Sequence, residues 1–130
     1  MNEKEIIKIA SNTNFFGLSD NYEFKAKYKN KNCGDIIEVE VNKNIDQMRF
    51  ETNSCIFTQA SAAILANNFI KIYRLDLKKI IIFIQKKLNG EQVKAPIKIK
   101  ELDFLINKKN KNRKDCITLP YYAVIKALNA

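Results

Sequence analysis

The hydrophobic pattern of this chain changes its period near residue 54, and that change constrains the fold more than any other feature. Before it, apolar and polar residues alternate in three stretches, "YEFKAKYK" (22–29), "DIIEVEVN" (35–42) and "IDQMRFET" (45–52). Such alternation is typical of half-buried β-strands. After it, "CIFTQASAAILANNFI" (55–70) is rich in alanine and has apolar residues at helical spacing. The order predicts an α+β fold: a three-stranded antiparallel sheet with helices packed on one face.

Further helices are expected on both sides of this central part. Residues 3–10 fit a short amphipathic helix, and another helix should begin near Asp76, a candidate N-cap. A short helix is expected around "KELDFLI", and "NKKNKNRK" (107–114) should be a solvated connection. The last stretch, "TLPYYAVIKALNA" (118–130), predicts a closing helix with Pro120 in its first turn, where proline is tolerated.

Length and charge limit the classes of function. At 130 residues, the chain is expected to be one domain, 1–130, with a sizeable core. Its net charge of +9 is what a nucleic-acid-binding protein would have, but the lysines are spread along the whole chain and no recognised RNA- or DNA-binding pattern accompanies them. We therefore expect no nucleic-acid partner. A basic module that binds RNA through the "NKKNKNRK" loop remains the alternative without a metal site.

The N-terminal stretch, the most apolar run and the cysteine count indicate the compartment in which the protein is expected. The opening "MNEKEIIKIASN" lacks the features of a secretory signal, and the run "KIIIFI" is too short to cross a bilayer. A cytoplasmic protein without membrane contact is expected. Three cysteines are an odd number, which argues against a disulfide framework and favours free thiols. Because the chain has no histidine, any metal must be held by cysteine and carboxylate.

The three cysteines all fall at boundaries between predicted elements. Cys33 lies in the turn between the first two strands, Cys55 where the third strand leads into a helix, and Cys116 just ahead of the last helix. A hairpin turn and two helix N-termini can converge at one end of a sheet, and a helix N-terminus favours the thiolate. Soft thiolates select zinc, copper(I) and iron–sulfur clusters, and three of them plus one carboxylate fill a tetrahedral site, for which Asp35 is the candidate fourth ligand.

A structural interpretation of the same cysteines stays open at this point. A free cysteine is commonly a small buried apolar residue, and the chain has no CxxC pair of the kind that marks zinc sites. Arg113 could stabilise a thiolate at Cys116 or could be an ordinary solvated residue. Asp115 is interpreted as an N-cap or loop carboxylate rather than a ligand.

The segment from "NKNCGDIIEVEV" to "CIFTQASAAILAN", together with "RKDCITLPYYAVIKAL", resembles the iron–sulfur cluster assembly scaffolds of the NifU, IscU and SufU kind. Those proteins carry a cysteine–glycine–aspartate turn between strands, a second cysteine before an alanine–serine-rich helix, and a third at the start of the last helix. The resemblance covers nearly the whole chain and implies a SufE/NifU-like fold. The long interval between Cys55 and Cys116, and Arg113 three residues before Cys116, are closest to the SufU branch.

The chain departs from the family pattern at three positions. Lys31 stands where the family has proline, Ser54 where it has glycine, and Asp115 where IscU-type proteins have histidine. The candidate ligands are intact, so the resemblance implies a divergent member that uses three cysteines and an aspartate.

The resemblance implies a function and its participants. Cys33, Asp35, Cys55 and Cys116 would hold a transient [2Fe–2S] cluster or Zn²⁺, with Asp35 as the labile ligand. Sulfur would come from a cysteine desulfurase, and apo iron–sulfur proteins would receive the cluster from a monomer or weak dimer. The alternative is a zinc-dependent sulfurtransferase in which Cys116 accepts persulfide and Arg113 stabilises its charge.

Overall fold

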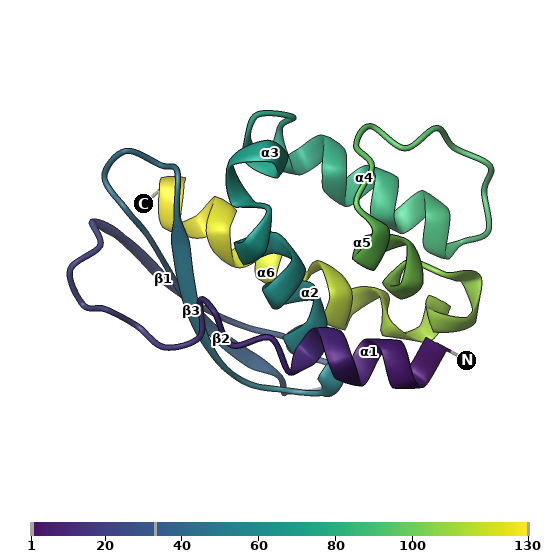
Figure 1. Ribbon diagram of the computed structural model, residues 1–130, viewed down its shortest axis with the longest axis horizontal. Helices are drawn as coiled ribbons and strands as arrows, with labels where there is room; N and C mark the ends of the chain where they lie inside the picture. The colour runs from purple at the N-terminus through teal and green to yellow at the C-terminus, as the bar shows by residue number, and fades with distance from the viewer. Residues whose placement is uncertain (1, 33, 130) are drawn as a thin grey trace.

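The computed structural model describes residues 2–32 and 34–129. The strands β1 (Phe24–Lys29), β2 (Ile36–Val41) and β3 (Met48–Asn53) form one antiparallel sheet in the order β1-β2-β3 (Figure 1). The helices are α1 (Asn2–Ala10), α2 (Ile56–Asn67), α3 (Phe69–Tyr73), α4 (Leu77–Leu88), α5 (Lys100–Leu105) and α6 (Lys114–Asn129), with a 3₁₀ segment η1 (Lys108–Arg113) before the last. The predicted α+β fold is confirmed.

The core lies between the sheet and two central helices. Val39 of β2 pairs with Ala26 of β1 and with Phe50 of β3, so these residues share one face. Helix α6 packs across β1 and β2, and α2 lies between α6 and α1 (Figure 1). Alternate residues Ile37, Val39 and Val41 are at most 1% exposed, as the period of two requires for a strand with one buried face. No helix in the described ranges is both long and apolar enough to span a membrane.

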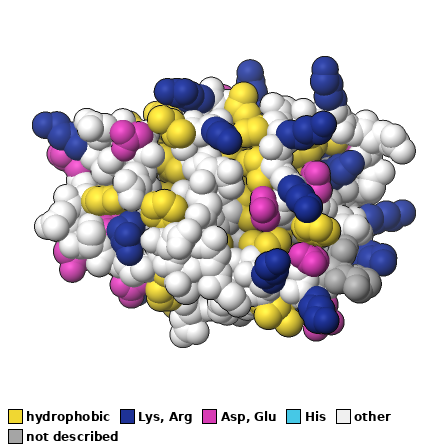
Figure 2. Space-filling view, in the orientation of Figure 1, with side chains coloured by type: hydrophobic (Ala, Val, Ile, Leu, Met, Phe, Trp, Pro, Cys, Tyr) yellow, Lys and Arg dark blue, Asp and Glu magenta, His cyan; other side chains and the backbone are white. Residues whose placement is uncertain are grey.

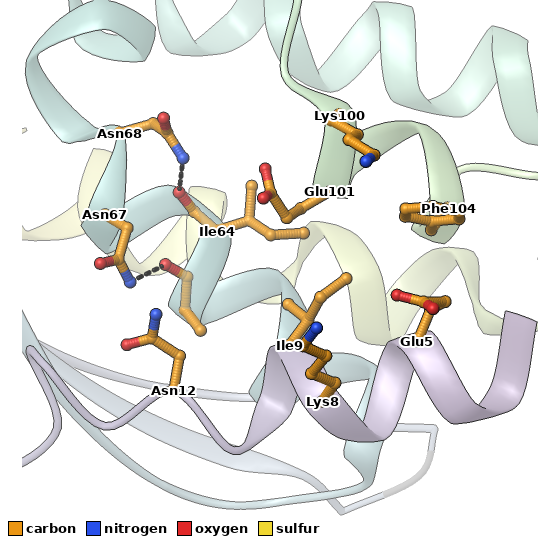
Figure 3. Close-up of a pocket in the computed structure, with 11 residues that line it drawn as sticks. Glu5, Lys8, Ile9, Asn12, Ile64, Asn67, Asn68, Lys100, Glu101 and Phe104 are labelled. Atoms are coloured by element: carbon orange, nitrogen blue, oxygen red, sulfur yellow. Dashed lines mark hydrogen bonds between the residues drawn. The ribbon is translucent and has the colours of Figure 1, made fainter.

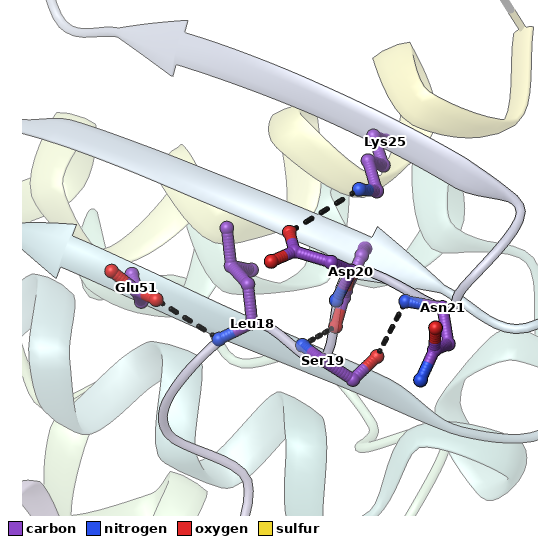
Figure 4. Close-up of polar contacts among 7 residues, drawn as sticks. Leu18, Ser19, Asp20, Asn21, Lys25 and Glu51 are labelled. Atoms are coloured by element: carbon purple, nitrogen blue, oxygen red, sulfur yellow. Dashed lines mark hydrogen bonds and ion pairs between the residues drawn. The ribbon is translucent and has the colours of Figure 1, made fainter.

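The connection between α1 and β1 covers part of the outer face of the sheet. The backbone N–H groups of Ser19 and Asp20 donate to the carboxylate of Glu40, and the N–H of Leu18 donates to Glu51 Oε2 at 3.0 Å (Figure 4). Glu40 is on the side opposite the core, yet it is 0% exposed because this connection lies over it. The two backbone donors compensate the burial of its carboxylate.

Two predicted helix boundaries are wrong. The stretch 55–70 is divided at Asn68, because Asn67 Nδ2 and Asn68 Nδ2 donate back to the carbonyls of Ala63 and Ile64, at 2.7 and 2.9 Å (Figure 3). The last helix begins at Lys114 rather than near residue 118, which puts Pro120 inside the helix instead of in its first turn.

The "NKKNKNRK" run is also more ordered than predicted. Asn107 accepts a hydrogen bond from the N–H of Lys109 at 2.9 Å and begins η1, which leads directly into α6. The charged side chains of η1 are nevertheless exposed, as expected for a solvated segment, and Lys114 is partly exposed. Two other predictions are confirmed, because Asp76 caps α4 by accepting from the N–H of Lys78 at 3.0 Å and "KELDFL" forms α5.

Candidate metal centre

Three of the four predicted ligands come together at one end of the sheet. Asp35, Cys55 and Cys116 each offer one donor atom, and these atoms all lie within 4.8 Å of one another. They belong to the β1–β2 turn, the residue before α2 and the first turn of α6. Asp35 and Cys116 are 8% and 5% exposed, and Cys55 is half-buried. The convergence of a hairpin turn with two helix N-termini is therefore observed, while Cys33, the fourth predicted ligand, lies outside the described residues.

Local hydrogen bonds hold the turn that presents Asp35. The Asn30 N–H donates to the Asp35 carbonyl at 2.8 Å, and the Gly34 N–H donates to the Asn30 carbonyl at 2.9 Å. Gly34 has φ +77°, a conformation that a side chain makes costly, although a Cβ there would meet no atom within 4 Å. Asn32 closes the turn by donating its N–H to Asn30 Oδ1 at 2.9 Å. Glycine is required here for its backbone and not for space.

The N-terminus of α2 supplies Cys55. The residue occupies the N-cap position with extended backbone (φ −69°, ψ 166°), and its side chain makes no capping hydrogen bond. Its carbonyl accepts from the Gln59 N–H at 3.1 Å and starts the helix. The thiol therefore does not cap the helix as a Ser or Asp side chain would. Cys55 Sγ lies 3.7 Å from Thr58 Oγ1.

Thr58 joins the three candidate ligands. Its hydroxyl donates to Asp35 Oδ2 at 2.9 Å and to the Cys116 carbonyl at 3.0 Å. The side chain is 0% exposed. Thr58 is not among the site residues predicted from the sequence. Two spacings in the sequence could have indicated Thr58. It lies one helical turn after Cys55, and Pro120 lies four residues after Cys116, so the Cys116 carbonyl needs a donor from outside its own helix.

The charged form of Asp35 is favoured although the residue is buried. Burial alone would raise the pKa of this carboxyl, but hydrogen bonds from Thr58, from the thiol and N–H of Cys55 and from Cys116 together lower it below its usual value. An anionic carboxylate beside two thiols is a donor set that suits a tetrahedral metal ion. Deprotonation of the thiols would complete the set, because the thiolate is the metal-binding form.

Two other predicted residues contact neighbouring elements. The guanidinium of Arg113 lies over the ring of Phe57, with 5.2 Å between its Cζ atom and the ring centroid, so it joins η1 to the first turn of α2. Asp115 is exposed in the first turn of α6 and accepts a hydrogen bond from Asn32 Nδ2 at 3.0 Å. That contact joins α6 to the turn that carries Asp35.

A separate surface groove of about 420 Å³ lies between α1, α2 and α5 (Figure 3). Each of two walls carries one basic and one acidic residue, Lys8 and Glu5 on α1 and Lys100 and Glu101 on α5. None of the candidate ligands lines it. The groove is therefore not part of the candidate metal centre.

Comparison with solved structures identifies the fold. A candidate iron–sulfur cluster assembly scaffold protein for the SUF system from Fervidobacterium islandicum superposes with a TM-score of 0.76 at 22% identity, over 96% of this chain and 94% of that one. The N-terminal part of a nitrogen-fixing NifU-like protein from Brucella abortus gives 0.77 at 19% identity, over 97% and 90%. A hypothetical protein gives 0.78 at 19% identity, over 99% and 97%. No protein-family profile and no curated sequence matches the chain.

Proposed function

We propose that this chain is a scaffold of the NifU/IscU/SufU type, on which an iron–sulfur cluster is assembled from iron and desulfurase-derived sulfur and then transferred to apo-proteins. The observation that carries the proposal is the approach of the donor atoms of Asp35, Cys55 and Cys116 to within 4.8 Å. The fold shared with proteins described as a NifU-like protein and a SUF scaffold adds support. Cys33 is proposed as the remaining ligand.

The donor set suits a cluster that must be released. Thiolates are soft ligands that bind iron and zinc strongly, whereas a carboxylate oxygen is a hard ligand that holds soft iron less firmly. The hydrogen bonds that lower the pKa of Asp35 offset its burial, so its carboxylate stays ionised at neutral pH. Asp35 is thus the proposed point of exchange, and Arg113 is proposed to stabilise thiolate or persulfide charge near Cys116.

The second candidate is a zinc-dependent sulfurtransferase that accepts persulfide from a cysteine desulfurase. One observation favours it. Tetrahedral zinc with Zn–S bonds of about 2.3 Å separates its sulfur ligands by roughly 3.8 Å, and donor atoms within 4.8 Å of one another are close to that spacing. Ligands on the two irons of a cluster would have to lie farther apart. In this candidate, Cys116 accepts the sulfur.

The partners follow from the same proposal. A cysteine desulfurase would supply sulfur, and apo iron–sulfur proteins would take the cluster from a monomer or weak dimer in the cytoplasm. The basic side chains lie mostly over the helical part of the molecule in Figure 2. Residues 54–130 carry 15 Lys and Arg against 5 Asp and Glu, and residues 1–53 carry 8 against 9. A partner that docks on the helical side is therefore expected to present acidic residues.

Anaerobic reconstitution tests the two candidates together. Purified protein is incubated with iron, cysteine and a cysteine desulfurase, and the visible spectrum is followed before and after an apo-ferredoxin is added. A cluster spectrum that moves to the ferredoxin supports the scaffold. Stoichiometric zinc with persulfide on Cys116 and no cluster supports the sulfurtransferase instead.

Carboxylate variants make this experiment specific for the site. Asp35→Ala should lower the retained zinc or alter the cluster spectrum, because it removes a proposed ligand. The matched control is Asp115→Ala, which removes a nearby exposed carboxylate outside the group of converging donors. Equal metal content in wild type, Asp35→Ala and Asp115→Ala would contradict the site as drawn.

A further inference from the structure

A proline in α6 leaves a backbone carbonyl of the candidate metal centre without its helical donor. In a regular helix, the carbonyl of residue 116 would accept from the N–H of residue 120. Residue 120 is Pro120, which has no N–H. The donor that replaces it comes from another helix, because Thr58 Oγ1 of α2 donates to the Cys116 carbonyl at 3.0 Å.

A second hydroxyl of α2 makes a parallel contact. Ser61 Oγ donates to the carbonyl of Ile117, the residue after Cys116. Thr58 and Ser61 are three residues apart and lie on the same face of α2, and both are 2% or less exposed. Pro120 comes one turn after these two successive carbonyls, and the two buried hydroxyls of α2 bind them. Only Thr58 also reaches the ligands.

The hydroxyl of Thr58 has one proton, and two oxygen acceptors lie within 3.0 Å of it. Asp35 Oδ2 lies at 2.9 Å and the Cys116 carbonyl at 3.0 Å, so one bond is made fully only at the expense of the other. An ionised carboxylate is the stronger acceptor and takes the proton when Asp35 carries its full charge.

We infer that Thr58 is a positioning residue of the metal centre: its single hydroxyl proton orients the Asp35 carboxylate for ligation, and its bond to the Cys116 carbonyl, to which Pro120 offers no N–H, ties the same hydroxyl to α6. The inference rests on the proposed metal binding. It assigns to Pro120 a role in the centre, because a regular helix would satisfy the Cys116 carbonyl by itself. It also links ligation at the β1–β2 turn to the backbone of α6.

Cobalt titration of the metal-free protein tests the inference, because cobalt–thiolate and d–d absorption bands report ligand geometry directly. Thr58→Val preserves the shape of the side chain and removes the hydroxyl, and it should weaken cobalt binding about tenfold, as loss of an outer-shell partner does. It should also change the d–d bands. Thr58→Ser keeps the hydroxyl and should restore both the affinity and the spectrum. Affinity in Thr58→Val equal to or tighter than wild type would overturn the inference.

Ser61→Ala is the matched control for a purely structural effect. It removes a hydroxyl–carbonyl bond of the same kind, one turn along the same helix, without touching Asp35 or Cys55. Both variants should lower the urea midpoint of the metal-free protein, but Ser61→Ala should leave the cobalt spectrum and affinity unchanged. If Ser61→Ala changes them as much as Thr58→Val does, the effect is general packing and the inference is wrong.

A proline variant separates the two bonds of Thr58. Pro120→Ala gives the Cys116 carbonyl a helical donor, so Thr58→Val should then shift the urea midpoint less than it does beside Pro120, while still weakening cobalt binding through Asp35. Equal shifts in both backgrounds would contradict the role given to Pro120. A wild-type protein that retains no cobalt overturns the proposed function and this inference with it. Wild-type binding that Thr58→Val fully preserves overturns the inference alone.

Discussion

The hydroxyl of Tyr121 is buried at a cost that a single substitution can reveal. Tyr121 is 0% exposed in α6, and among the described residues its hydroxyl has no hydrogen-bond partner. Burial accordingly raises the pKa of this phenol far above its usual value. An unpaired buried hydroxyl costs roughly 1–3 kcal/mol of desolvation, whereas deletion of one oxygen leaves a void smaller than a methyl group. Tyr121→Phe should therefore stabilise the metal-free protein by about 1 kcal/mol.

Thermal and urea denaturation with a chelator present measure this change without a contribution from bound metal. A gain of about 1 kcal/mol corresponds to a rise in Tm of roughly 3–4 °C for a chain of this length. Tyr122→Phe is the control, because Tyr122 is 37% exposed and accepts only a 3.4 Å hydrogen bond from Gln85; its effect should stay within about 0.5 kcal/mol. A loss of stability in Tyr121→Phe would refute the reasoning, because it would mean that the hydroxyl has a partner in solution.

Three further predictions concern the β1–β2 turn. Because its pKa is lowered in the folded state, Asp35 should stabilise the metal-free protein fully above its unfolded-state pKa of roughly 3.9 and lose that contribution as the pH falls through the lower folded value. Acid unfolding followed by circular dichroism should therefore differ for Asp35→Asn, and superimposable curves would count against it. Gly34→Ala should cost about 1–2 kcal/mol in urea denaturation, because φ is +77° and no atom obstructs the Cβ; an unchanged midpoint would contradict this. Asp35→Cys should slow cluster transfer to apo-ferredoxin by replacing the hard ligand with a soft one, and faster transfer would argue against Asp35 as the point of exchange.

The strands could be predicted because alternation is a local pattern, and the meeting of the candidate ligands could be predicted because all of them lie at boundaries between elements. Alternation in β2 requires Ile37, Val39 and Val41 to share a face, and the antiparallel register then sets Phe50 beside Val39. The same pattern puts Asp35 at the end of the sheet where α2 begins. Cys55 lies at the same end of the sheet because α2 follows β3 directly. Cys116 lies there because it is in the first turn of the last helix, α6.

The features that could not be predicted depend on contacts between distant segments. Asn68 interrupts a stretch of good helix formers because two asparagine side chains bind back to the helix, which periodicity does not register. Glu40 looks like a solvent-facing strand residue until the connection before β1 covers it. Pro120 was expected in a first turn because helix-interior proline is costly, and the compensating donor, Thr58, is 62 positions earlier in the chain.

X-ray absorption at the zinc edge of the zinc-loaded protein counts the atoms that bind the metal and so reports whether the cysteines and Asp35 hold it. The chain has no histidine, so sulfur and oxygen are its available side-chain ligands at this centre. We expect three sulfur atoms at about 2.3 Å and one oxygen at about 2.0–2.2 Å, with the oxygen contribution altered in Asp35→Ala. A first shell of oxygen or nitrogen atoms without sulfur would contradict the claim that Cys55, Cys116 and Asp35 form a metal centre.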